Sequence, residues 1–215
     1  AIAAVEAALG GALPDELATF AREVTAGGAG PGYGLIPIDR AVAHVVRAPA
    51  GAPWQRALPL AHLGCGYAAV LALDGDAAGA LWLDARAVGV LAPLAPSLTA
   101  CYARWVDDLA RARWPALPIP PGACALAGAL SGYLAHCEAE AGVPAGTLAG
   151  DALRAALGRL GPGAIRIAGP SAIGWFADDD PVDPCIACAR MLAELTADGL
   201  APDAVAPGVP PRPLR

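Results

Sequence analysis

The chain contains no lysine and no asparagine, and only 16% of its residues are charged. The missing lysine excludes three enzyme classes, because Schiff-base enzymes, kinases and P-loop NTPases each depend on a lysine amine. Acidic residues outnumber arginines by 20 to 14, which gives a net charge of −6. Because such a chain does not attract a phosphate backbone, non-specific binding of nucleic acid is not expected.

Long apolar runs are also missing. The longest apolar stretches, around residues 63–73 and 123–135, are shorter than the ~18 residues that a membrane-spanning helix requires. No basic segment precedes an apolar run at the start of the chain, so a secretory signal is not expected either. With 215 residues, 56% of them hydrophobic, the chain can form one large domain or two small ones. We therefore expect a folded cytoplasmic protein without a membrane segment.

Three helices are expected in the first half of the chain. Apolar residues recur at helical spacing over residues 2–9, 13–24 and 98–109. The second of these helices begins at Pro14, which is followed by two acidic residues, as is typical of a first helical turn. The third follows Ser97, whose side chain is a good N-cap. Its opposite face is charged and is expected to face solvent.

Strand signals lie between the second and third of these helices. A glycine-rich run at 27–34 leads into an expected short strand at 35–38. The segments 66–74 and 79–84 are apolar and flank a turn, which together predict a β-hairpin. Helices and antiparallel strands in this arrangement predict the α+β class.

A proline-rich break at residues 114–122 separates the two halves. Beyond it, apolar spacing predicts helices around 126–137 and 153–160, and a last helix that begins near Asp183. Ile165 and Ile167 suggest a short strand between the helix around 153–160 and the last helix. The expected organisation is an α+β domain at 1–114, a mainly helical second half at 115–199, and a proline-rich tail at 200–215.

Several turn and core signals of the first half occur in a characteristic order. These are Leu13-Pro14 with Leu17 and Phe20, the glycine run 27–34, Leu35-Ile36-Pro37-Ile38, Gly64-Cys65-Gly66, Gly75 with the segment 79–84, and a helix closing at Leu109. The order resembles the SUKH superfamily, which contains the fungal cell-wall assembly regulator domain and many bacterial toxin-immunity proteins. The resemblance covers about the first half. It implies a curved, mostly antiparallel sheet flanked by helices that binds another protein, and it brings no catalytic residues.

The expected hairpin also provides candidate residues for binding a protein partner. If Leu81 and Leu83 face the helices, strand alternation places Trp82 on the opposite face, together with Tyr67. Exposed aromatic rings beside acidic residues are typical anchors at protein interfaces. The alternative is that the second half covers this face and both rings lie in the core. The candidate partner-binding residues are Tyr67, Trp82, Asp74, Asp76 and Asp84.

The six cysteines lie in a chain that is large enough to fold without disulfides: Cys65, Cys101, Cys124, Cys137, Cys185 and Cys188. We expect them to be mainly reduced core residues. The last two form a CxxC pair at an expected helix start, where the pKa of a thiol is lowered, so a redox or metal-binding role stays open beside burial. Zinc would need two further ligands. His62 with Cys65, or His136 with Cys137, could provide these ligands. Neither pair has a recognised zinc-finger spacing.

Other motifs do not reach a recognised site. The segment 64–69 fits a loose dinucleotide fingerprint but lacks the required strand before and helix after it. Asp74-Gly75-Asp76 starts like a calcium loop but lacks the later ligands. Ser171 is one residue out of register for GxSxG, and the acidic run 178–180 is typical of a solvated loop. No catalytic residue, metal or cofactor is therefore predicted.

Our first hypothesis is a non-enzymatic, cytoplasmic protein-binding domain. By the resemblance, it is a bacterial immunity protein that occludes a secreted toxin, with the acidic surface increasing the rate of encounter with a basic partner. The alternatives are a thiol redox or metal-binding protein that uses Cys185 and Cys188, and a regulatory scaffold that uses the proline-rich tail.

Overall fold

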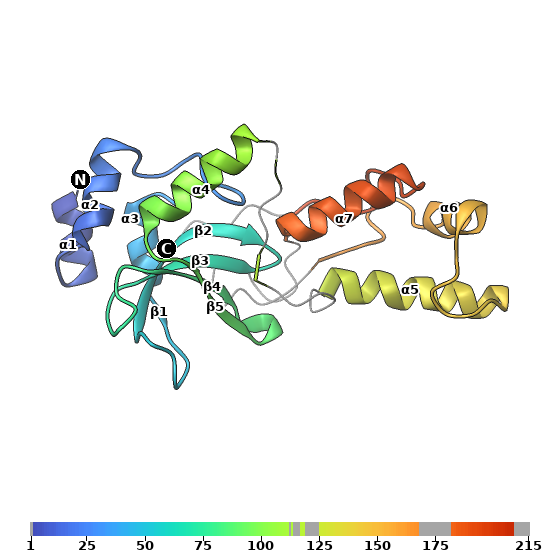
Figure 1. Ribbon diagram of the computed structural model, residues 1–215, viewed down its shortest axis with the longest axis horizontal. Coiled ribbons are helices and arrows are strands. Elements are labelled where there is room, and N and C mark those ends of the chain that lie inside the picture. The colour runs from blue at the N-terminus through green and yellow to red at the C-terminus, as the bar shows by residue number, and fades with distance from the viewer. Residues whose placement is uncertain (1, 112, 114–116, 119–124, 168–181, 209–215) are drawn as a thin grey trace.

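The structure is a computed structural model that describes residues 2–111, 113, 117–118, 125–167 and 182–208 (Figure 1). A five-stranded antiparallel sheet in the order β1-β2-β3-β4-β5 is combined with seven α-helices among these residues. Each strand pairs with the strand before it in the chain, so the sheet is a simple meander that does not close. The predicted α+β class is confirmed.

All five strands lie in the first half, and so do four of the helices. The strands are β1 (Val46–Arg47), β2 (Arg56–Gly64), β3 (Tyr67–Ala72), β4 (Leu81–Ala85) and β5 (Val90–Ala95). The helices are α1 (Ile2–Leu9), α2 (Asp15–Glu23), α3 (Ile38–Ala41) and α4 (Leu98–Ala110). The second half contributes α5 (Ala125–Ala141), α6 (Gly150–Gly158) and α7 (Ile186–Ala197), so the mainly helical extension is confirmed for the described residues.

The predicted hairpin is formed by β3 and β4, in which Ala68 is opposite Asp84 and Leu71 is opposite Leu81. Every residue of β3 is buried, and so is every residue of β2 after Arg56. A strand that is buried on both faces has a continuous apolar sequence rather than an alternating one. The centre of the sheet is therefore covered on both sides.

The predicted strand at 35–38 is not formed. Leu35 makes isolated antiparallel bridges with Gly28 and Ala61, and Ile38 is the first residue of α3. Pro37 precedes this helix, which agrees with the inability of proline to donate a backbone hydrogen bond to a sheet. The strand expected near Ile165 is likewise a single bridge, parallel to Val205.

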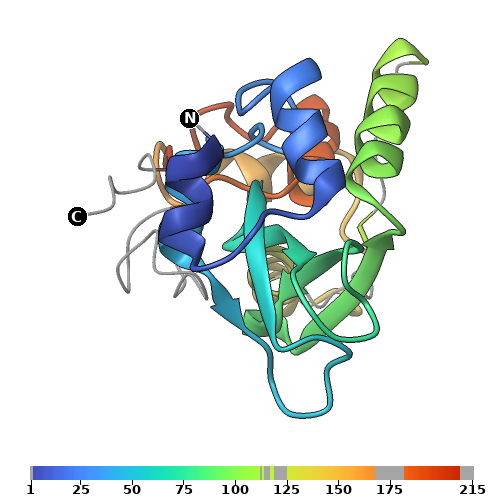
Figure 2. The same ribbon diagram turned by 90° about the vertical axis from the view of Figure 1, so that its left-hand side faces the viewer.

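Helices α2 and α4 pack together beside the sheet. The ring of Phe20 meets that of Tyr102 edge to face, with 5.1 Å between the centroids. The Ser97 hydroxyl accepts a hydrogen bond from the Ala100 N–H at 3.2 Å, which confirms the predicted N-cap of α4. Figure 2 shows α1, α2 and α4 grouped on one side of the strands.

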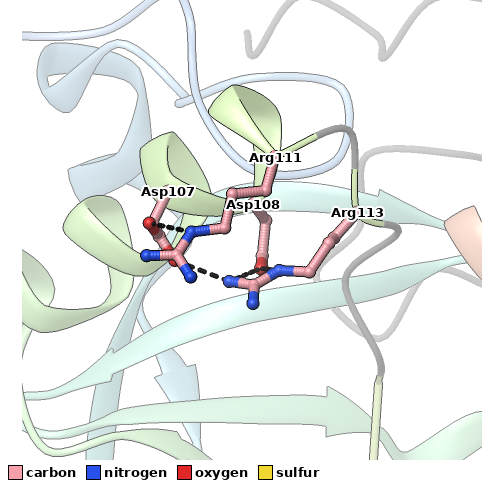
Figure 3. A network of polar contacts seen from close by, with 4 residues as sticks. All are labelled: Asp107, Asp108, Arg111 and Arg113. Atoms are coloured by element: carbon pink, nitrogen blue, oxygen red, sulfur yellow. Dashed lines mark hydrogen bonds and ion pairs between the residues drawn. The ribbon is translucent and has the colours of Figure 1, made fainter.

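The charged face of α4 is electrically balanced at its C-terminal end (Figure 3). The Arg111 Nε lies 2.8 Å from a carboxylate oxygen of Asp107, and the guanidinium of Arg113 contacts both Asp107 and Asp108. Exposed ion pairs such as these contribute little to stability. Because the charges satisfy one another, this face does not form a patch of one sign.

Helices α5, α6 and α7 lie beyond one end of the sheet, on the right-hand side of Figure 1. The hydrophobic core is nevertheless continuous, because residues of both halves, including Leu63, Leu157 and Cys185, belong to one buried cluster. Among the described residues, no helix is long and apolar enough to cross a membrane. Ser171, Cys124, the apolar run 173–176 and the acidic run 178–180 lie outside the described residues.

Candidate metal centre

The turn between β2 and β3 brings Cys65 to the end of the sheet that faces the second half. Cys65 has a backbone φ of +53°, and among the described residues no other non-glycine has a positive φ. Its neighbours Gly64 and Gly66, with φ of +86° and +75°, also need the left-handed region. The sequence Gly-Cys-Gly is thus suited to a tight turn whose tip presents a thiol.

This turn packs directly against the backbone at the start of α7. A Cβ placed on Gly64 would lie 2.5 Å from the Cα of Cys185 and 2.5 Å from the carbonyl oxygen of Pro184. The Cys65 N–H donates a hydrogen bond to the carbonyl of Asp183 at 2.8 Å, and the Cys185 N–H donates to the Cys65 Sγ at 3.1 Å. Two segments that are 120 residues apart in the chain are therefore joined by reciprocal hydrogen bonds.

Three sulfur atoms meet at this junction. Cys185 is the N-cap of α7 and Cys188 lies in its first turn. The Sγ atoms of Cys65, Cys185 and Cys188 all lie within 4.8 Å of one another, and the Cys65 and Cys188 sulfurs are 3.9 Å apart. Tetrahedral ligands about 2.3 Å from a zinc ion are separated by roughly 3.8 Å, so this spacing fits a shared ion. Cys185 and Cys188 are buried, and Cys65 is partly exposed.

Aromatic side chains cover the same junction. The Tyr33 hydroxyl donates a hydrogen bond to the Pro184 carbonyl at 2.6 Å, and the Tyr33 ring lies 5.6 Å from that of His62. Burial, followed by the negative charges of Asp183 and Cys65, raises the pKa of Tyr33, so its hydroxyl stays protonated as a donor. Burial lowers the pKa of His62 to about 4, against a smaller opposing effect of Asp183, so this imidazole is neutral at pH 7.

The buried His62 predicts a pH dependence of stability. Its folded-state pKa of about 4 lies below the ordinary value of 6.5. Between these two pH values the imidazole is therefore protonated in the unfolded chain and neutral in the folded chain. Stability should fall as the pH drops below 6.5, by roughly 2 kcal/mol between pH 7.5 and pH 5. Urea unfolding at the two pH values, with a chelator present, measures this loss. The variant His62→Gln should show a smaller loss, and an unchanged loss would contradict the prediction.

Two of the five predicted partner-binding residues are in the interior. Tyr67 is 1% exposed, and Asp84 is 1% exposed with its carboxylate bound to Arg86 by two contacts of 2.8 Å. Neither side chain can reach a partner in this conformation. For Tyr67 the structure agrees with the alternative in which the ring belongs to the core.

The other three predicted residues lie at or near the surface. Asp76 is exposed in the turn between β3 and β4, and Trp82 is half-buried on β4. Asp74 is half-buried and accepts hydrogen bonds from the backbone N–H groups of Arg56 and Gln55, which hold its pKa below the ordinary value. The indole N–H of Trp82 is buried and has no hydrogen-bond partner among the described residues.

The sequence offers Cys65, together with His62, as further zinc ligands for the CxxC pair, and the structure places Cys65 beside that pair. His62 is not one of the three residues whose ligand atoms meet at the junction. The other candidate pair lies elsewhere on α5, where the Cys137 Sγ accepts a hydrogen bond from the Arg159 guanidinium at 3.0 Å. The available signal was the Gly-Cys-Gly sequence, which predicts a turn that exposes a thiol.

Comparisons of the chain with protein-family models, with curated proteins and with solved structures found no match.

Proposed function

We propose that this chain is a metal-binding protein that holds one Zn²⁺ ion through the Sγ atoms of Cys65, Cys185 and Cys188, with water in the fourth tetrahedral position. The observation that carries the proposal is the meeting of three sulfurs, from two distant segments, within 4.8 Å. Thiolate sulfur selects soft or borderline cations, and zinc is the commonest metal in cysteine-rich structural sites. The ion has a structural role, because it ties the β2–β3 turn to the start of α7.

The surroundings of the sulfurs also favour a bound cation. The Cys185 N–H points at the Cys65 sulfur, and such bonds to a charged acceptor stabilise a thiolate. Cys185 and Cys188 lie at the N-terminus of a 12-residue helix, where the helix dipole favours negative charge. Three neighbouring thiolates would repel one another without a cation between them, and a divalent ion removes that repulsion.

Metal content tests the proposal. The chain is purified with a reductant, equilibrated with zinc, freed of excess metal, and analysed by mass spectrometry of its metals. We expect one zinc per chain, and thiolate-to-metal charge-transfer absorption after replacement by Co²⁺. Cys65→Ser and Cys188→Ser should each lose the ion. Cys101→Ser removes another buried cysteine, on α4, and should keep it. Failure of the parent chain to retain zinc, or full retention by Cys65→Ser, would refute the proposal.

As a second candidate, we propose that the sheet domain binds a basic protein, as an immunity protein binds a toxin. One surface feature favours it. The turn between β3 and β4 presents the exposed Asp76 on a chain with a net charge of −6, whereas the neighbouring Asp74 is paired with Arg56 at 3.0 Å. Acidic groups at such a position increase the rate of encounter with a cationic partner. The half-buried Trp82 on β4 provides an apolar contact for the bound state.

Salt dependence tests this second candidate. The probe is the protein encoded by the gene immediately upstream of the chain's own, and its association rate is measured at low and at high salt. Asp76→Ala should reduce the low-salt rate by about two- to fivefold. Asp151→Ala removes a fully exposed acid on α6 and should leave the rate unchanged. Equal effects of the two variants, or no association at low salt, would count against this candidate.

A further inference from the structure

We infer that oxidation by a hydroperoxide joins Cys65 to Cys188 in a disulfide and expels the ion, so that the junction is held either by metal or by a covalent bond. The inference rests on the proposed function, because it concerns the regulation of the same site. It singles out one pair among the three cysteines, and the geometry gives each member of that pair a different part in the reaction.

Exposure identifies Cys65 as the thiol that an oxidant reaches first. Cys65 is partly exposed at the tip of its turn, whereas Cys185 is 0% exposed and Cys188 is 2% exposed. The thiolate form is the nucleophile toward peroxide. The hydrogen bond from the Cys185 N–H, at 3.1 Å, favours this form of Cys65. The backbone N–H of Cys185 therefore favours the reactive form of Cys65.

Distance identifies Cys188 as the thiol that completes the disulfide. Its Sγ lies 3.9 Å from that of Cys65, and the two atoms need to approach by about 2 Å to reach a normal S–S bond length. Cys188 also lies in the first turn of α7, a position that favours a thiolate.

The reaction balances with hydrogen peroxide as the oxidant. The Cys65 thiolate attacks one peroxide oxygen, the O–O bond breaks, and hydroxide leaves as the sulfenic acid forms. The Cys188 thiolate then attacks the Cys65 sulfur, and the S–OH bond breaks with loss of a second hydroxide. Two protons from the thiols or the solvent convert both hydroxides to water. Two thiols are oxidised and one peroxide is reduced to two waters.

The disulfide changes what holds the two halves together. Once Cys65 and Cys188 are joined, Cys185 is the one thiolate of the three that can still bind metal, and a single ligand does not retain zinc. The new bond closes a loop between positions 123 residues apart, and cross-links of long loops restrict the unfolded chain. The junction therefore stays linked while zinc is released.

The experiment starts from the zinc-loaded chain, whose metal content is measured before any oxidant is added. Hydrogen peroxide is then added in stoichiometric amount, released zinc is followed with a coloured chelator, and peptides are mapped without reduction. We expect one zinc released for each Cys65–Cys188 disulfide, with both reversed by dithiothreitol and added zinc. Cys185→Ser should still form this disulfide, and Cys65→Ser should not.

The outcomes separate the inference from the proposed function. If zinc is bound but the main product is a Cys185–Cys188 disulfide, or if Cys185→Ser forms no cross-link, the inference is overturned and the zinc site stands. If the untreated chain binds no zinc, the proposed function is overturned. If a Cys65–Cys188 disulfide still forms in that case, it links the two segments but does not release zinc, so the inferred exchange is overturned as well.

Discussion

Saturating zinc is expected to raise the free energy of unfolding by about 4 kcal/mol when its free concentration is about 1,000 times its dissociation constant. The reason is linkage: the three sulfurs come together only in the folded chain, so the ion binds the folded state and stabilises it. The unfolded chain separates Cys65 from Cys185 by 120 residues and cannot offer the same set of ligands. Urea unfolding with zinc and with a chelator measures the difference.

Two variants make this measurement specific to the site. Cys188→Ser should unfold at the same urea concentration with and without zinc, because it leaves too few thiolates for tight binding. Cys101→Ser costs stability of its own, since Cys101 is buried on α4, but it should keep the full increment in the free energy of unfolding that zinc provides. An equal increment in the parent chain and in Cys188→Ser would place the zinc elsewhere and contradict the prediction.

The parts of the fold that the sequence predicts are those whose signals are local. The helix at 98–110 has an N-cap and a regular apolar stripe within 13 residues, and it forms where expected. The β3–β4 hairpin has its own turn between two apolar segments. Neither element needs a distant residue to specify it, because capping and periodicity act over a few residues.

The burial of a strand depends on which distant segments pack against it, and local sequence patterns do not predict that packing. β2 covers residues 56–64, and Pro59 is among its buried residues. Strand alternation leaves Tyr67 open between an exposed face and the core, because the rule indicates exposure only when one face of the sheet is in water. Because both faces of β3 are buried, alternation carries no information about exposure at that position.

The candidate site is the clearest example of a long-range arrangement. Its CxxC half can be found in the sequence, but its third cysteine comes from a turn more than a hundred residues earlier. No spacing rule connects Cys65 to Cys185, because the connection is made by the packing of Gly64 against the backbone of Pro184 and Cys185. Gly64 therefore positions the site, because its lack of a side chain allows the turn to contact the backbone of Cys185.

Replacing that glycine should disrupt the site without touching a sulfur. Gly64→Ala would place a Cβ 2.5 Å from backbone atoms of Pro184 and Cys185, which cannot move aside as a flexible side chain can. We expect it to lower the free energy of unfolding by roughly 3 kcal/mol, about 1 from the positive φ and the rest from the separated backbones. Zinc affinity should fall more than tenfold, because the turn can no longer bring Cys65 close to Cys185. Urea unfolding and zinc titration measure the two effects.

Gly79 provides a matched control for this variant. Its φ of +85° equals that of Gly64 within one degree, but a Cβ there would meet no atom within 4 Å. Gly79→Ala should therefore cost only the backbone term, about 1 kcal/mol, and leave zinc affinity unchanged. The difference between the two variants isolates the contact between the turn and the start of α7. Equal losses of stability, with zinc affinity preserved in both, would mean that the turn can withdraw from Cys185 and that the three sulfurs do not depend on this packing.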